Sequence, residues 1–193
     1  MRTSVYVHFP WCLKKCPYCD FASGGIRRDA VPHVAYADAL LRELEARAPT
    51  LAGRTLESVF FGGGTPSLWA PDELGRVLRA VRGAFDADDG VEVTVECNPT
   101  SLDRSKAAAL RAVGVDRLSL GAQSLDGGRL RFLGRLHDAE TALAALRAAT
   151  AEMPRVSADL MFGMPGQTPA DFEREIERVL ATGVEHVSAY ALT

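Results

Sequence analysis

Short runs of apolar and β-branched residues alternate along the chain with longer, alanine-rich segments. Runs of this length that are rich in Val, Phe and Leu are typical of buried strands. Six of them are predicted to be strands: Val5–Phe9, Val59–Phe61, Val91–Glu96, Arg117–Gly121, Val156–Phe162 and His186–Leu192.

The segments between these strands carry one apolar face each, at the spacing of amphipathic helices. The faces comprise Leu40, Leu41 and Leu44, then Leu74, Val77, Leu78, Val81 and Phe85, and finally Phe172, Ile176, Val179 and Leu180. The last helix has the clearest bounds. Thr168 is its expected N-cap, Pro169 occupies the first helical position, and Asp171 favours the helix start. Gly183 is expected to end it.

Strand–helix alternation predicts parallel strands joined by right-handed crossovers. Six strands and five helices are too few for a closed eight-fold barrel, and they favour an α/β fold of the open, partial TIM-type (β/α)6 kind. No long linker divides the chain, so residues 1–193 are predicted to form a single domain. No helix follows the last strand, which leaves an apolar face and an edge uncovered. We therefore expect a longer protein, with a covering C-terminal domain that is absent from this chain.

Composition narrows the functional classes. The net charge is −3 and charged residues make up 24% of the chain, without the clustered Lys and Arg of a nucleic-acid footprint. No apolar run is long enough to span a membrane, and no export signal is visible, so a cytoplasmic location is predicted. Three of the four cysteines lie within eight residues, which indicates metal binding or redox work rather than a disulfide framework.

Cys12, Cys16 and Cys19 have the spacing C-x3-C-x2-C, directly after the first predicted strand. Thiolates are the usual ligands of iron–sulfur clusters, and a short loop can hold three corners of a cubane. Three protein ligands leave one iron with an open position, as in catalytic metal sites. The spacing alone also allows a zinc site made of the three cysteines with His8 or Cys97.

The cysteine spacing, with an aromatic residue before the third cysteine, resembles the signature of the radical S-adenosylmethionine (SAM) superfamily. The surrounding residues resemble its HemW and HemN group, the haem chaperones and oxygen-independent coproporphyrinogen III dehydrogenases. The similar blocks are Tyr6–Phe21, Phe61–Ser67, Glu96–Pro99, Leu118–Ser124, Leu133–Asp138 and Asp159–Thr168. This resemblance implies a [4Fe-4S] cluster on the three cysteines, with SAM bound at the open iron and cleaved reductively.

The resemblance also implies a SAM pocket. Its residues would be Tyr6, Tyr18, Gly63, Gly64, Thr65, Glu96, Gln123, Arg135 and Asp159. The residue types suit this role, because glycine allows close backbone approach and a carboxylate such as Glu96 can accept from two ribose hydroxyls. The alternatives are a tight turn for the glycines and a solvated strand end for Glu96. Most of these positions fall at the same ends of parallel strands, where such folds place their sites.

Phe21 distinguishes the chain from the dehydrogenases and favours the haem chaperones, because the dehydrogenases have a fourth cysteine at this position. The prediction is therefore a radical SAM protein that binds haem and delivers it to acceptor proteins, with an electron donor protein as a further partner. The alternatives are a coproporphyrinogen III dehydrogenase and a non-redox zinc module. Trp11 and Phe21 are expected to shield the cluster from solvent. His8 is expected to support the cluster or a substrate indirectly, through the residues around it. Cys97 is expected to pack in the core.

Overall fold

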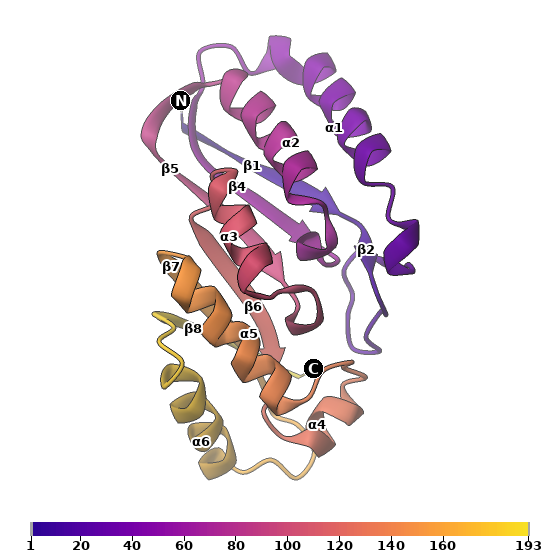
Figure 1. Cartoon of the computed structure of the whole chain (residues 1–193), viewed down its shortest axis with the longest axis vertical. Coiled ribbons are helices and arrows are strands. Elements are labelled where there is room, and N and C mark those ends of the chain that lie inside the picture. Colours follow the sequence, from indigo (N-terminus) through magenta and orange to yellow (C-terminus); the bar gives the residue numbers. More distant parts are fainter. Residues whose placement is uncertain (1, 193) are drawn as a thin grey trace.

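In the part of the chain that the structure describes, six parallel strands form one sheet in the order β1-β4-β5-β6-β7-β8 (Figure 1). The structure is a computed structural model that describes residues 2–192, apart from the side chains of residues 87–89. The strands of this sheet are β1 (Arg2–Phe9), β4 (Thr55–Gly63), β5 (Asp86–Cys97), β6 (Arg117–Gln123), β7 (Arg155–Phe162) and β8 (His186–Ala191). Each strand pairs with the next along the chain, as expected of a barrel that stays open, so the predicted fold class is confirmed.

The strand bounds differ from the prediction mainly at their amino ends. β5 begins at Asp86 rather than Val91, and β4 begins at Thr55 rather than Val59. These extensions were not predicted because they contain polar residues, whereas the strands were predicted from runs of apolar residues. β8 ends one residue before the predicted Leu192, and Thr193 lies outside the described residues.

Residues 2–192 form six helices beside the sheet, one more than the five predicted. They are α1 (His33–Arg47), α2 (Pro71–Gly83), α3 (Arg104–Ala112), α4 (Gly127–Phe132), α5 (Ala139–Glu152) and α6 (Pro169–Leu180). Short 3-10 turns lie at Arg28–Ala30, Ala48–Thr50, Pro66–Leu68 and Pro99–Ser101. The helix that the prediction missed is α4, which begins with two glycines and buries only Leu130. A helix of six residues with one buried position has no apolar periodicity from which it could be predicted.

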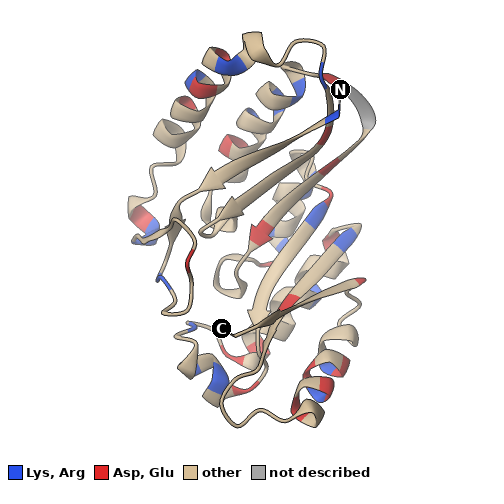
Figure 2. Ribbon diagram, turned by 180° about the vertical axis from the view of Figure 1, so that it is seen from behind, with Lys and Arg blue, Asp and Glu red and all other residues tan. Residues whose placement is uncertain are grey.

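The two faces of the sheet differ in chemistry. The helices lie in front of the sheet in Figure 1, and the strands stand in front when the molecule is turned in Figure 2. Alternate residues of the strands are buried toward the helices, among them Phe9, Val59, Phe61, Val93, Val95, Leu118, Leu120 and Leu160. The residues between them face the inside of the open barrel and include Thr94, Glu96, Ser119 and Asp159. The period of two along each strand therefore separates the core from a polar inner face.

The start of α6 follows the prediction closely. The Thr168 hydroxyl accepts from the Asp171 amide at 3.2 Å, and the Asp171 carboxylate accepts from the Thr168 amide at 2.9 Å, which completes a capping box. The predicted apolar face is wrong at Leu180, whose exposed fraction is 50%. Glu175 is buried instead, because charged and polar partners meet its carboxylate.

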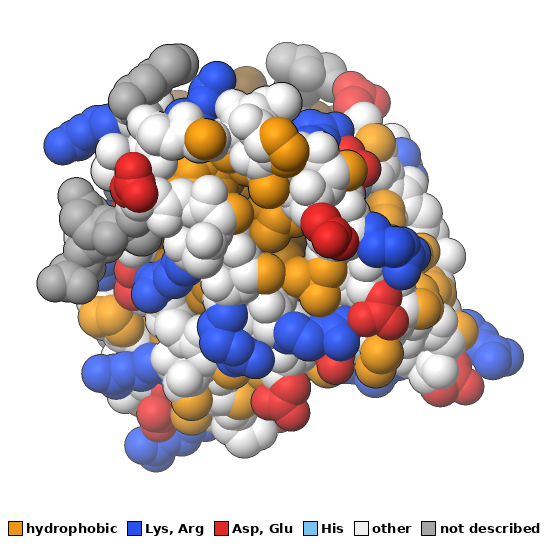
Figure 3. Space-filling model, turned by 90° about the horizontal axis from the view of Figure 1, so that it is seen from above, with side chains coloured by type: hydrophobic (Ala, Val, Ile, Leu, Met, Phe, Trp, Pro, Cys, Tyr) orange, Lys and Arg blue, Asp and Glu red, His pale blue; other side chains and the backbone are white. Residues whose placement is uncertain are grey.

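Charges of both signs are distributed over the end of the molecule shown in Figure 3. Lys and Arg side chains are interspersed there with Asp and Glu around a central group of apolar side chains. Among the described residues, no helix is both long and apolar enough to cross a membrane.

Close packing between α2 and α3 gives a prediction about stability. A Cβ on Gly75 would lie 2.7 Å from Cβ of Val113, whereas a Cβ on Gly83 would meet nothing within 4 Å. Overpacking costs about 1–3 kcal/mol, against a gain of about 1 kcal/mol in helix propensity. We expect Gly75→Ala to lower the free energy of unfolding by up to about 2 kcal/mol in urea titrations. Gly83→Ala is the matched control and should be neutral or slightly stabilising. Equal stability of the two variants would contradict the packing argument.

Candidate functional site

The three clustered cysteines lie in a loop whose two ends are held together. The two-residue strands β2 (Trp11–Cys12) and β3 (Gly24–Gly25) pair in parallel at its base. The Gly24 amide donates to the Pro10 carbonyl and the Ile26 amide donates to the Cys12 carbonyl, both at 2.8 Å. All three thiols are free and half-buried. The loop is therefore closed at its base and presents its sulfurs inward.

The cysteine loop forms one wall of a cavity of about 330 Å³ at the carboxyl ends of the strands. The cavity is lined by all three cysteines and by eight of the nine predicted SAM-pocket residues: Tyr18, Gly63, Gly64, Thr65, Glu96, Gln123, Arg135 and Asp159. Tyr6 is the exception. The Tyr6 ring lies beside Gly62 and does not line the cavity, and 57% of this residue is exposed. Parallel strands thus bring together residues that are far apart in the sequence.

The glycine run after β4 packs directly on the backbone that leads into the cysteine loop. The Gly64 amide donates to the Phe9 carbonyl at 2.6 Å, and the Thr65 amide donates to the Trp11 carbonyl at 2.8 Å. A Cβ on Gly64 would lie 2.5 Å from the Trp11 carbonyl oxygen. Gly63 has a φ of +111°, which favours glycine. These glycines are required by the approach of two protein segments, whatever ligand the cavity holds.

Two carboxylates face the cavity from neighbouring parts of the sheet. Glu96 accepts a hydrogen bond from the Gly63 amide at 2.9 Å, and burial, followed by the charge of Asp159, raises its pKa. Asp159 accepts from the Ser119 hydroxyl at 3.1 Å, and burial raises its pKa as well. Glu96 is therefore not a freely solvated strand end, which was the alternative from sequence.

Arg135 connects the cysteine loop to the strand ends. Its Nη2 donates to the Gly121 carbonyl at 2.7 Å, and its Nη1 lies 3.5 Å from Sγ of Cys16. Its Nε is buried and has no hydrogen-bond partner among the described residues. The preceding Gly134, with a φ of +69°, lies against Pro17 of the loop. A cation at this place suits a cavity that holds anionic thiolates or a carboxylate ligand.

The arrangement of the cysteines bears on the choice between zinc and a cluster. Within residues 2–192, no group of three or more His, Cys, Asp or Glu side chains is placed to hold a single metal ion. A zinc site needs its ligands within about 2.0–2.3 Å of one point, whereas a cubane is held at separate corners. Three half-buried thiols around one cavity are compatible with the three corner ligands of a [4Fe-4S] cluster.

Comparison with known proteins agrees with this geometry. Residues 6–179 match the Radical SAM superfamily. The chain belongs to the radical SAM superfamily. This membership implies a [4Fe-4S] cluster and SAM as cofactors.

The radical SAM chain is similar to several better-known members. It is 44% identical to radical S-adenosyl methionine domain-containing protein 1, mitochondrial, of Bos taurus, over 100% of this chain and 43% of that protein. It is 34% identical to the heme chaperone HemW of Haemophilus influenzae, over 98% of this chain and 51% of that protein. The solved structure of coproporphyrinogen III oxidase (HemN) from Escherichia coli superposes with a TM-score of 0.85 at 30% identity, covering 98% of this chain and 44% of that one. The predicted resemblance is confirmed, and the chain spans about half the length of these relatives.

The structure also places the residues that were expected to support the cluster from outside its ligands. Phe21 lines the cavity and is 60% exposed, and its expected shielding of the cluster stays a prediction. Trp11 packs edge-on against the rings of Phe9 and Tyr36, on the core side of the loop. His8 does not line the cavity; its Nε2 pairs with the Ala22 carbonyl at 2.8 Å and so ties β1 to the loop.

Two other predictions about single residues can be compared with the structure. Cys97 is buried, as predicted for a core residue, and burial raises the pKa of its thiol to about 12. The pKa of Tyr18 is also raised to about 12, chiefly by burial, although the nearby Arg135 lowers it. Both groups are therefore neutral at physiological pH and are not ionised partners of a ligand.

Several residues that line or support the cavity were not predicted from the sequence. Ser119, Met161 and Tyr190 also line the cavity. Glu175 and Arg129 form a buried ion pair behind it, at 2.8 Å. Ser119 could have been found from strand alternation, because it lies two residues before Gly121 on the inner face. The Glu175–Arg129 pair joins two helices 46 residues apart, which no spacing reveals.

The glycine wall yields a prediction about cofactor retention. Gly64→Ala would place a methyl group against the Trp11 backbone, which has no flexible end to move. We expect the Cys12 end of the loop to shift, with lower iron content after anaerobic reconstitution and a loss of about 1–3 kcal/mol in unfolding free energy. Gly25→Ala, in the same loop but with nothing within 4 Å of the added Cβ, is the control and should retain iron. Normal iron content in Gly64→Ala would show that the close approach is not needed.

Proposed function

We propose that this chain holds a [4Fe-4S] cluster through Cys12, Cys16 and Cys19, binds SAM beside it, and forms part of a protein that delivers haem to acceptor proteins. The observation that carries the proposal is the shared cavity, in which the three thiols face the glycine wall and the two carboxylates. The superfamily match supports both cofactors. Haem as cargo is supported by the similarity to proteins named heme chaperone HemW.

Different residues of the cavity would bind different parts of the cofactors. The cysteines would ligate the cluster, and Arg135 would lie beside it as a compensating cation. Glu96 would accept from the SAM ribose, while the Gly63–Thr65 run would admit the ligand close to the backbone. Gln123 and Asp159 would complete the pocket, with Tyr18 and Tyr6 near its edge. When bound, the cluster supplies the electron that cleaves SAM reductively.

The haem-delivery part of the proposal rests on Phe21. The dehydrogenases of the group have a fourth cysteine at this position, and here a phenylalanine stands exposed at the mouth of the cavity. An electron donor protein and haem acceptors are the protein partners this function requires. A reducing, cytoplasmic location belongs to the same proposal, because three clustered cysteines indicate metal binding rather than a disulfide framework.

A second candidate function is oxidative decarboxylation of coproporphyrinogen III. The observation that favours it is the TM-score of 0.85 to the solved coproporphyrinogen III oxidase over 98% of this chain. The shared fold accommodates both functions, because function resides in the site rather than in the architecture.

The cluster assignment predicts the behaviour of single cysteine variants. Anaerobic reconstitution should give about four irons per chain. Replacing Cys12, Cys16 or Cys19 by Ala should abolish stable iron binding and the brown colour, because each loss removes one corner ligand. Cys97→Ala should keep its iron and serves as the control. Full iron retention in Cys16→Ala, or one zinc per chain in a colourless protein, would overturn the assignment.

The ribose assignment predicts a selective loss of SAM affinity. Glu96→Gln should weaken SAM binding by roughly tenfold to a hundredfold, the equivalent of losing hydrogen bonds to a charged acceptor. Iron content should not change, because Glu96 does not ligate the cluster. The control is Glu92→Gln, four residues earlier on the same face of β5, where the carboxylate pairs with Arg155. Isothermal titration would measure both, and equal SAM affinities for Glu96→Gln and the wild type would reject the ribose role.

The choice between the two functions is decided by assaying them side by side in the full-length protein, reconstituted without oxygen. We expect haem to bind and to transfer to an acceptor apoprotein, and no protoporphyrinogen to form from coproporphyrinogen III. Formation of protoporphyrinogen at a catalytic rate would establish the dehydrogenase instead. Phe21→Cys is an informative companion variant, because it restores the fourth cysteine without altering the cluster ligands.

A further inference from the structure

Gln123, at the end of β6, has a backbone conformation that side chains rarely adopt. Its φ of 67° is the one positive value found at a non-glycine position within residues 2–192. The Ser124 amide donates to the Ala122 carbonyl at 2.9 Å, so Gln123 is the central residue of a three-residue turn. This φ-positive form of the γ-turn is rare and strained. Such strain persists only where the surrounding structure imposes it.

The turn directs the Gln123 amide at the cavity. Its Nε2 lies 2.8 Å from the place that a Cβ on Gly121 would occupy, so the side chain folds over a glycine that lines the same cavity. The pairing of β6 with β7 shifts register between Gly121 and Gln123, which marks the same irregularity in the sheet. The strained backbone and the position of the amide are thus two aspects of one local structure.

The residues before the turn are held by the segment that follows α4. The Gly121 carbonyl accepts from Nη2 of Arg135 at 2.7 Å, and the Ala122 carbonyl pairs with Nε2 of His137 at 3.0 Å. His137 is buried, and burial lowers its pKa to about 4, so the ring is neutral. This side of the turn is fixed by groups already placed around the cavity.

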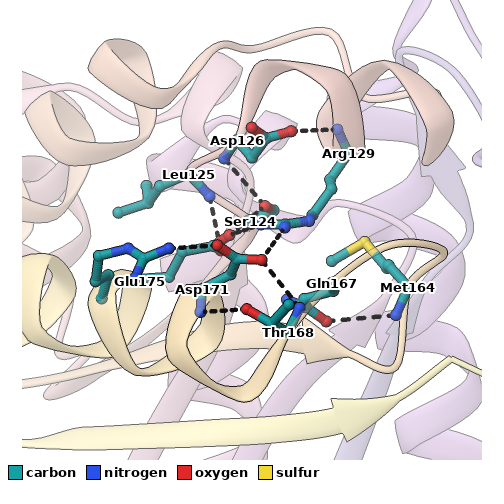
Figure 4. A network of polar contacts seen from close by, with 10 residues as sticks. Ser124, Leu125, Asp126, Arg129, Met164, Gln167, Thr168, Asp171 and Glu175 are labelled. Atoms are coloured by element: carbon teal, nitrogen blue, oxygen red, sulfur yellow. Dashed lines mark hydrogen bonds and ion pairs between the residues drawn. The ribbon is translucent and has the colours of Figure 1, made fainter.

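The residues after the turn are held by Glu175 of α6 (Figure 4). Its Oε1 accepts from the Ser124 hydroxyl at 3.1 Å, and its Oε2 accepts from the Leu125 amide at 2.9 Å. Nη1 of Arg129 donates to the same Oε1 at 2.8 Å, while Nη2 of Arg129 donates to Asp171 at 3.0 Å. One carboxylate therefore joins the turn, α4 and α6.

Packing alone does not explain why the Glu175 carboxylate is buried. Glu175 is only 5% exposed, and replacing such an ion pair with apolar residues of similar volume is often neutral or stabilising. What an apolar residue could not do is accept from the Leu125 amide and the Ser124 hydroxyl at once. These are the first two residues after Gln123, where the chain must be fixed if the turn is to stay closed.

We propose that Glu175 is a positioning residue that, paired with Arg129, holds the strained turn after β6 and so directs the Gln123 amide at SAM. The inference rests on the proposed function, since it takes the cavity to be the SAM site. Glu175 itself does not line that cavity and acts through Gln123.

The test is a double-mutant cycle on SAM affinity in the full-length protein, reconstituted without oxygen, with iron content and the urea midpoint measured in parallel. Glu175→Gln should weaken SAM binding about tenfold, the equivalent of one charge-assisted interaction. Gln123→Ala should weaken it by a similar factor. In the Gln123→Ala background, Glu175→Gln should change SAM affinity by less than about twofold, because the two residues act through one contact. Iron content should be unchanged throughout.

A purely structural role would give a different result, with a lower urea midpoint and independent, multiplying effects on SAM affinity. That outcome, or unchanged SAM affinity in Glu175→Gln, would overturn the inference while leaving the proposed function intact. Ser124→Ala removes one of the same hydrogen bonds and should weaken SAM binding to a smaller degree, so it decides the matter if Glu175→Gln does not fold. Arg178→Gln, on the same helix, breaks an ion pair with Glu140 that lies outside this network, and should leave SAM affinity unchanged. A wild-type protein that holds its cluster but fails to bind SAM would overturn the proposed function itself.

Discussion

The close approach of two backbone segments is the constraint on which the site depends. The run from Gly63 to Thr65 lies so near the Phe9–Trp11 segment that a single Cβ on Gly64 would stand 2.5 Å from a carbonyl oxygen. Two backbone hydrogen bonds, from the Gly64 and Thr65 amides, hold the segments together. Because one segment leads into the cysteine loop and the other borders the ligand cavity, this contact sets the distance between the cluster ligands and the proposed SAM pocket.

The sheet can support such a site because one of its faces packs in the core and the other presents polar groups to the cavity. Toward the helices, alternate strand residues such as Phe61, Val95 and Leu120 are fully buried and supply the hydrophobic stabilisation. The inner face is left free for polar groups, and most of these are satisfied locally, as in the bond from Ser119 to Asp159. The stability of the core thus offsets the strain and the desolvated charges that gather at the strand ends.

How far the sequence predicts this structure depends on whether the signal is local. The six strands and the cysteine loop were predictable, because each is specified by a contiguous run, and parallel pairing then collects their carboxyl ends. The helix α4 was not, since its two leading glycines and single buried residue give no period. Glu175 was missed for a different reason, because a charged residue on a helix is normally exposed and its partner Arg129 lies on another element.

The two buried carboxyl groups of the cavity make its stability depend on pH. Burial raises the pKa of both Glu96 and Asp159, so the folded protein binds protons at these groups more tightly than the unfolded chain does. Their contribution to stability is therefore largest below the unfolded pKa values and declines as the pH rises through the folded ones. A cation placed beside the two carboxylates would lower both pKa values and remove that cost. In the proposed function the positively charged sulfonium of SAM would be such a cation, so SAM binding and the ionisation of these two carboxyls would be coupled.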